Sequence, residues 1–283
     1  MTVKLVTDST SYIDTETQLE LDIKTVNLSV HFPDESFDET AVSHEYFYKK
    51  VDESKTIPTS SQPTVGEMYA VFKDIVMRGE QVLGIFISSK MSGTYETALS
   101  AKQMVLDEYP QALIEILDSK TNSMALGIQV IEAAVAAKAG KKMEEVKAIA
   151  QQISEKVHFY FVPATLEYLI KGGRIGGAAA LIGSLLKIRP LLYVNNEGIA
   201  DVYDKFRGTK KAVDCMLKIL QEDARKHGLR HLVVHHIFNE DQGRKLAEQL
   251  SKQYNRHVPT LSIGPVIGTH VGPGAIGIVY CTE

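Results

Sequence analysis

Residues 81–108 read QVLGIFISSKMSGTYETALSAKQMVLDE, and this stretch contains a strand, a loop and a helix in succession. The apolar run Gln81–Ser88 predicts a short buried strand, and the pattern of Tyr95–Glu108 predicts a helix. Serines, a threonine and a glycine fill the loop between them. Because a strand that leads directly into a helix is the repeating unit of parallel sheets covered by helices, the stretch predicts an α/β fold.

The same alternation extends through the first half of the chain. Its further predicted strands are Lys4–Thr7, Lys24–His31 and Leu113–Leu117, and its further predicted helices are Gly66–Met77, Met124–Ala139 and Met143–Lys156. Thr64 and Glu67 have the spacing of a capping box at the start of the first of these helices. We therefore expect residues 1–157 to form an N-terminal domain with a mostly parallel sheet flanked by helices.

The second half is less regular and predicts a second α/β domain, residues 158–283, with a mixed sheet. Its predicted strands are His158–Val162, Leu191–Val194, Ile199–Phe206, His231–His235, Thr260–Ile263 and Ile276–Cys281. Asn195–Gly198 predicts a hairpin turn, so at least one strand pair should be antiparallel. Helices are predicted at Thr209–Lys226 and Asp241–Tyr254, the second with a capping box of Asn239 and Gln242.

Composition limits the classes of protein that the chain can belong to. Hydrophobic residues make up 44% and charged residues 23%, which is typical of a soluble globular protein. The net charge of -4 disfavours a nucleic-acid binder. Two cysteines far apart in sequence, the absence of a signal peptide and the lack of a long apolar run predict a cytoplasmic protein without a membrane span.

Two hydroxyl-rich loops could bind an anion. Ser92, Gly93 and Thr94 directly precede a predicted helix, whose first N–H groups and partial positive charge attract anions. Ser60 and Ser61 lie in a second loop, between Pro58 and Pro63. Each loop could instead have a purely structural role. The serine of the first loop would then be the N-cap of the helix, and the hydroxyls of the second would bond to the nearby backbone in a loop stiffened by proline.

His270 lies among glycines in the stretch Gly264–Gly274. It could donate a hydrogen bond to a carboxylate, act as a base, or serve only to stabilise a turn. With Ser92 as nucleophile it could form a Ser/His esterase or thioesterase, but the nucleophile-elbow motif is missing. We expect no metal site, because no cluster of metal ligands is present in the sequence.

Two basic turns complete the set of motifs. Arg174 follows two glycines after a predicted helical stretch, Leu166–Ile170, and Arg207 precedes Gly208 and Thr209. Neither turn has the sequence of a phosphate loop. Both are either ordinary solvated surface or, because arginine suits the recognition of acidic and phosphate groups, part of a surface that binds a partner.

These motifs, in this order, resemble those of the DegV family of bacterial fatty-acid-binding proteins. The resemblance rests on Thr7–Thr10, Thr59–Pro63 with Gly66, Ile87–Tyr95, Asp118-Ser119, Leu169–Gly176, Arg207–Lys211 and Gly264–Gly274. It implies two α/β domains and a buried acyl chain. By this resemblance the carboxylate of the fatty acid is bound by a hydroxyl of the Ser60 loop, by Ser92 and by His270.

Members of the family known as FakB present the bound fatty acid to a separate kinase, which phosphorylates its carboxylate. The resemblance therefore implies a non-catalytic carrier with a long-chain fatty acid, such as palmitate or oleate, as its ligand and no cofactor. The kinase would be its protein partner, recognised through Arg174 and Arg207. We expect no nucleic acid and at most transient contact with a membrane surface.

Overall fold

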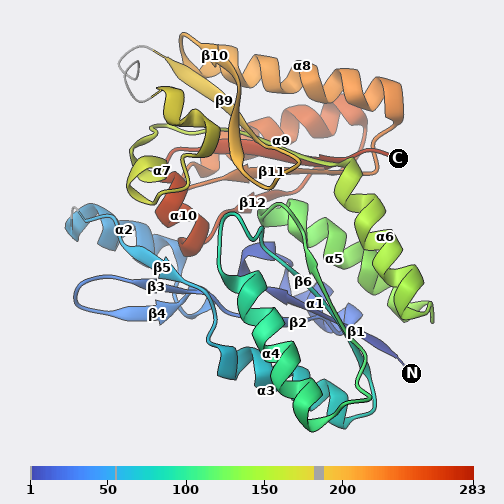
Figure 1. The fold of residues 1–283 in the computed structure, drawn as a ribbon. Helices are drawn as coiled ribbons and strands as arrows, with labels where there is room; N and C mark the ends of the chain where they lie inside the picture. The colour runs from blue at the N-terminus through green and yellow to red at the C-terminus, as the bar shows by residue number, and fades with distance from the viewer. Residues whose placement is uncertain (1, 55, 182–187) are drawn as a thin grey trace. The chain divides into compact units, whose positions relative to one another are not determined.

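The structure is a computed structural model that describes residues 2–54, 56–181 and 188–283 (Figure 1). The chain forms two compact units. Unit 1 comprises residues 1–29, 38–40 and 60–155, and unit 2 comprises residues 30–37, 41–59 and 156–283. A segment from the first sixty residues thus belongs to the same unit as the C-terminal half. The division of the chain into domains of residues 1–157 and 158–283 stays a prediction.

Unit 1 is built on a parallel sheet of four strands in the order β2-β1-β6-β7. These strands are β1 (Val3–Asp8), β2 (Lys24–Val26), β6 (Gln81–Phe86) and β7 (Ile114–Asp118). The parallel register pairs Val6 with Gly84 and Phe86 with Asp118, so β6 has a neighbour on each side. The parallel N-terminal sheet of the sequence-based prediction is confirmed.

Helices cover this sheet because they carry apolar faces. The helices of unit 1 are α1 (Thr15–Leu21), α3 (Val65–Met77), α4 (Thr94–Glu108), α5 (Ser123–Lys138) and α6 (Met143–Lys156), with the 3-10 turns η1 (Ser9–Ser11) and η2 (Glu39–Ala41). Phe72 of α3 and Ala101 of α4 pack in one core with Val82 and Phe86 of β6. The predicted capping box at Thr64 is present, since its hydroxyl and the Glu67 carboxylate each accept from the other's backbone N–H.

Unit 2 contains a mixed sheet of six strands in the order β10-β9-β8-β13-β11-β12. The strands are β8 (Val157–Val162), β9 (Arg189–Val194), β10 (Ala200–Phe206), β11 (His231–His236), β12 (Thr260–Ser262) and β13 (Ile276–Cys281). The β11–β12 pair is parallel, and the hairpin of β9 and β10 at Asn195–Gly198 is antiparallel as predicted. The mixed C-terminal sheet is confirmed.

Two long helices, α8 (Thr209–His227) and α9 (Glu240–Tyr254), share one core with this sheet. The shorter helices of unit 2 are α2 (His44–Ser54), α7 (Glu167–Lys171) and α10 (Pro265–Val271), and η3 spans Gly176–Leu181. Helix α10 contacts both α7 and α2. None of the helices in the described residues is long and apolar enough to span a membrane.

The structure corrects three predictions of local structure. The strand expected at Lys24–His31 is two short strands in different sheets, β2 and β3 (Ser29–His31); β3 lies between β4 (Ser36–Asp38) and β5 (Thr59–Ser61) in a third sheet. The glycine-rich stretch around His270 is largely a helix, α10. Asn239 is the N-cap of α9 but forms no capping box, because its amide donates to Gln242 instead of accepting from the backbone.

Candidate functional site

The loop that carries Ser92 leaves the carboxyl end of β6 and leads into α4. The backbone N–H groups of Met91 and Ser92 both donate to the carbonyl of Ser88, at 2.9 and 3.0 Å, which closes a tight turn. The hydroxyl oxygens of Ser92 and Thr94 lie 2.9 Å apart and share a hydrogen bond. Thr94 is fully buried, whereas Ser92 and Gly93 are half-buried, so the turn presents Ser92 and orients it through Thr94.

The N-cap of α4 is Gly93, which supplies no side-chain hydrogen bond to the helix. The alternative interpretation of Ser92 as a plain N-cap serine is therefore wrong in this structure. A helix start without a side-chain cap leaves first-turn N–H groups to be satisfied by water or by a ligand. The geometry at the start of α4 is compatible with the binding of an anion.

The loop of Ser60 and Ser61 lies beside this turn within unit 1. A Cβ atom added to Gly93 would lie 3.0 Å from the Gln62 side-chain nitrogen, so Gln62 packs directly on the glycine. Ser60 and Ser61 form the end of β5 and are half-buried. The structure thus brings the two predicted hydroxyl loops of unit 1 together.

Asp8, at the end of β1, is a residue that the sequence analysis did not include in the site. Its side chain is fully buried and accepts hydrogen bonds from the backbone N–H groups of Thr10 and Ile87, at 3.0 and 2.8 Å. Burial raises the pKa of Asp8 to about 6, against the opposing effect of these hydrogen bonds. Its position directly after a strand, in line with Asp118, was the signal in the sequence.

His270 lies in the last turn of α10, in unit 2. Gly172 and Gly272 make room on either side of this turn: a Cβ atom on Gly172 would overlap the His270 ring, and one on Gly272 would overlap the Tyr168 ring. Gly272 also has a φ of 82°, a conformation that favours glycine. The glycines around His270 therefore serve close packing between α10 and α7.

Burial of the imidazole lowers the pKa of His270 to about 4, and the positive charge of Arg174 acts in the same direction. The histidine is consequently neutral at pH 7. A neutral imidazole offers one N–H donor and one acceptor nitrogen. His270 can thus donate a hydrogen bond to a carboxylate oxygen without carrying a charge before the ligand arrives.

Both predicted arginines are exposed, and both belong to unit 2. The guanidinium of Arg174 donates to the carbonyl of Gly172 at 2.6 Å, which holds it on the turn after α7. Arg207 lies between β10 and α8, next to Gly208, whose φ is 99°. Gly172 is the C-cap of α7.

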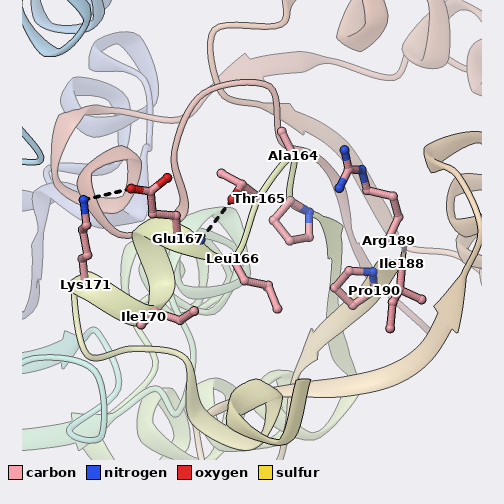
Figure 2. Close-up of a pocket in the computed structure, with 10 residues that line it drawn as sticks. Ala164, Thr165, Leu166, Glu167, Ile170, Lys171, Ile188, Arg189 and Pro190 are labelled. Carbon is pink, nitrogen blue, oxygen red and sulfur yellow. Dashed lines mark hydrogen bonds and ion pairs between the residues drawn. The ribbon is translucent and has the colours of Figure 1, made fainter. Parts of the chain in front are cut away.

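A cavity of about 360 Å³ lies in unit 2 beside α7 (Figure 2). Apolar side chains make up most of its wall: Pro163, Ala164, Leu166, Ile170, Ile188 and Pro190. Glu167 and Lys171 form an ion pair of 2.8 Å at its edge, and the Glu167 backbone N–H donates to the Thr165 hydroxyl at 3.1 Å (Figure 2). The cavity is large enough for a small-molecule ligand, whose sites typically span ~300–1,000 Å³.

Within residues 2–54, 56–181 and 188–283, no group of three or more histidine, cysteine, aspartate or glutamate side chains could hold a metal ion. The candidate groups of the site are hydroxyls, backbone N–H groups and one neutral imidazole. Such groups bind a carboxylate or phosphate through hydrogen bonds.

Known proteins resemble this chain over its full length. A family model described as an uncharacterised protein of the DegV family matches residues 2–283. A DegV domain-containing protein of Clostridium acetobutylicum is 49% identical, with 100% of this chain and 99% of that protein covered. The crystal structure of DegV from Bacillus subtilis, described as a fatty acid binding protein, is 34% identical with a TM-score of 0.88 and full coverage of both chains. A stearic acid-binding protein from Eubacterium ventriosum is 25% identical with a TM-score of 0.89, covering 99% of this chain and 98% of that one.

Proposed function

Because the chain belongs to the DegV family, we propose that it binds a long-chain fatty acid such as palmitate or oleate without covalent attachment. The observation that carries the proposal is the full-length likeness to the B. subtilis protein, which is 34% identical and described as fatty acid binding. Burial of an acyl chain contributes ~0.8 kcal/mol per methylene group, which is ample for tight binding.

The fatty acid carboxylate is bound by the hydroxyl-rich loops and by His270. Ser92, Thr94 and the Gly93 backbone provide donors at the start of α4, and Ser60 and Ser61 provide hydroxyls beside them. Neutral His270 can donate one N–H hydrogen bond to a carboxylate. These groups satisfy an anion whose burial without hydrogen bonds would be costly.

The acyl chain occupies the cavity beside α7. The apolar lining of the cavity supports this proposal, because the side chains of Leu166, Ile170 and Pro190 would make nonpolar contacts with an acyl chain. The helix that carries Ile170 ends at Gly172, the residue packed against His270, so carboxylate donor and apolar wall flank the same short helix. A larger side chain at Ile170 should therefore shorten the longest acyl chain that binds.

The bound carboxylate is presented to a separate fatty acid kinase, and the chain is a cytoplasmic carrier subunit with no cofactor of its own. Arg174 and Arg207 support a partner surface because both are exposed cations next to glycine-containing turns. Arginine forms bidentate hydrogen bonds with carboxylate and phosphate groups, which suits the approach of a nucleotide-binding partner.

Titration of delipidated protein with palmitate and oleate tests the proposed function. Saturable one-to-one binding and a raised melting temperature are expected, because a ligand that binds only the folded state stabilises it. Native mass spectrometry of the protein before delipidation should detect a fatty acid released by organic solvent. Failure to bind any acyl chain, or turnover of an ester or thioester substrate, would contradict the proposal.

No observation favours the alternative of a Ser/His esterase. The Ser92 hydroxyl bonds to the Thr94 hydroxyl at 2.9 Å and, weakly, to the Thr94 backbone. An activated serine instead has a hydrogen bond to its general base. Ser92 is therefore assigned to binding.

A further inference from the structure

The loop that carries Ser92 emerges between two strands that each end in an aspartate. β6 lies between β1 and β7, and all three strands are parallel. Asp8 is the last residue of β1, and Asp118, which pairs with Phe86, is the last residue of β7. The two carboxylates thus flank the point where the chain leaves β6.

Both carboxylates hold the first residues of that loop. Asp8 accepts from the backbone N–H of Ile87 at 2.8 Å. Asp118 accepts from the hydroxyl of Ser89 at 2.6 Å and from its backbone N–H at 3.3 Å. The intervening residue, Ser88, donates its backbone N–H to the Thr121 carbonyl at 2.8 Å. Three consecutive residues are therefore fixed to the ends of β1 and β7 and to the loop that follows β7.

Fixing Ser88 also fixes Ser92. The carbonyl of Ser88 accepts from Ser92 N–H at 3.0 Å, and the Ser88 hydroxyl accepts from Lys90 N–H at 3.2 Å. The position of the Ser92 hydroxyl therefore depends on hydrogen bonds that start at Asp8 and Asp118. We infer that Asp8 and Asp118 are positioning residues that set the carboxylate-binding geometry of Ser92, Gly93 and Thr94.

Asp8 should have the larger effect of the two, because its side chain is fully buried and its bond to Ile87 N–H joins the loop to β1. One of its oxygens accepts from both the backbone N–H and the hydroxyl of Thr10, at 3.0 and 2.5 Å, while the other accepts from Ile87. A fully buried carboxylate is retained here although burial raises its pKa to about 6. Asp118 is half-buried, and its Ser89 partner is a hydroxyl that can rotate.

Replacing Asp8 with asparagine keeps the contacts with Thr10 and removes the contact with Ile87, with little change in side-chain size. The amide oxygen would remain on the side of Thr10, where two donors converge, and the amide nitrogen would then face Ile87 N–H, donor against donor. Asp8→Asn thus releases the loop from β1. Asp118→Asn is milder, because the Ser89 hydroxyl can turn to accept from the new amide.

The inference rests on the proposed carboxylate binding. One experiment distinguishes a failure of the inference from a failure of the proposed function. Affinities for palmitate and for methyl palmitate are measured on the wild type, Asp8→Asn, Asp118→Asn and Ser92→Ala. Asp8→Asn should weaken palmitate binding about tenfold, as for the loss of one hydrogen bond to a charged group, and Asp118→Asn about threefold. Methyl palmitate binding should not change. In the double variant with Ser92→Ala, Asp8→Asn should weaken palmitate binding less than it does alone, because part of its effect passes through the Ser92 hydroxyl.

The control is Asp22→Asn, which removes the ion pairs of Asp22 with Lys4 and Lys24 in the same unit and should leave both affinities unchanged. Equal weakening of acid and ester by Asp8→Asn, or no weakening, would overturn the inference. If Asp8→Asn does not fold, the double variant of Ser89→Ala with Asp118→Asn replaces it. This double variant should weaken palmitate binding and leave methyl palmitate binding unchanged. A wild type that binds neither ligand would instead refute the proposed function, and a Ser92→Ala variant with wild-type affinity would remove Ser92 from the proposed site.

Discussion

The turn of Ser92 and the turn of His270 are held in place by different interactions. Ser92 is positioned by hydrogen bonds that lead back to two aspartates at strand ends. His270 is positioned by close packing, since glycines at 172 and 272 let α10 approach α7. Hydrogen-bonded geometry is sensitive to changes of polarity, and packed geometry is sensitive to changes of volume. The two regions should therefore respond to different substitutions.

The largest effect is expected from Gly172→Ala. Gly172 has an ordinary φ of -76°, so alanine strains no backbone, but its Cβ would overlap the His270 ring. Overpacking of this kind costs about 1–3 kcal/mol and would displace the imidazole. We expect palmitate affinity, measured by calorimetry, to fall about 100-fold, equivalent to ~2.7 kcal/mol.

Gly173→Ala is the matched control for that variant. Gly173 has a φ of 69° but open space around its Cβ position, so alanine strains the backbone without touching His270. The cost is about 1 kcal/mol of stability. Its palmitate affinity should stay near that of the wild type; similar losses in both variants would show that volume at His270 is not the cause.

As the pH falls, the ionisable groups of the two regions should change the stability of the protein in opposite directions. The pKa of His270 is lowered to about 4, so the unfolded state binds more protons between pH 6.5 and 4, and this histidine reduces stability as the pH falls through that window. The pKa of Asp8 is raised to about 6, so Asp8 adds stability as the pH falls from 6 toward 4. Melting temperatures measured from pH 7 to pH 5 compare the two.

His270→Gln should therefore lose less stability than the wild type between pH 6.5 and 5, by about 2 kcal/mol. Asp8→Asn should lose more stability over the same range. His235, whose pKa burial also lowers to about 4, contributes equally in all of these proteins. Identical pH profiles for the three proteins would contradict the assigned burial of both groups.

Ser92→Ala tests the hydrogen-bonded region directly. Removal of a hydroxyl that donates to a carboxylate costs about 1–2 kcal/mol, so palmitate affinity should fall about tenfold, whereas methyl palmitate affinity should hardly change. The control is Ser100→Ala in α4, because that hydroxyl is exposed and donates to the Glu96 carbonyl of its own helix. An unchanged acid affinity in Ser92→Ala would remove Ser92 from the site.

The smallest effect on lipid affinity is expected from Arg174→Ala. Its exposed guanidinium bonds to the carbonyl of Gly172 and affects His270 through charge, so palmitate affinity should stay within about twofold. Acyl-phosphate formation with a cognate kinase should fall strongly. Arg244→Ala, at an exposed arginine of unit 2 that pairs with Asp241 and Glu248 on its own helix, is the matched control. Loss of lipid binding in Arg174→Ala would place the arginine at the carboxylate.

The strands and longer helices could be predicted because their signals are local. Met143–Lys156 and Ile276–Cys281 have the predicted bounds, since an amphipathic period and a β-branched run are properties of neighbouring residues. Helix α10 was missed because its glycines disfavour a helix in isolation. Contacts with α2 and α7 override that preference; Gly268, for instance, packs against the Tyr48 hydroxyl.

The residues of the candidate site divide in the same way, into those that a local pattern identifies and those whose role depends on distant contacts. Ser92, Gly93 and Thr94 could be identified from the sequence, because a hydroxyl-rich loop before a helix is a local pattern. The role of Asp8 depends on Ile87, 79 positions away, and that distance is spanned only when β1 pairs with β6. The burial that keeps His270 neutral likewise comes from distant residues such as Gly172.

The early segment that belongs to unit 2 has a consequence for synthesis of the chain. Phe47 and Tyr48 are almost fully buried in the finished protein, and the Tyr48 hydroxyl donates to the Ile263 carbonyl, 215 positions later. At ~5–20 residues per second, a ribosome needs on the order of 10–40 s to make the intervening chain. During that time α2 lacks the residues that cover it, so the nascent chain exposes two aromatic rings to which chaperones can bind.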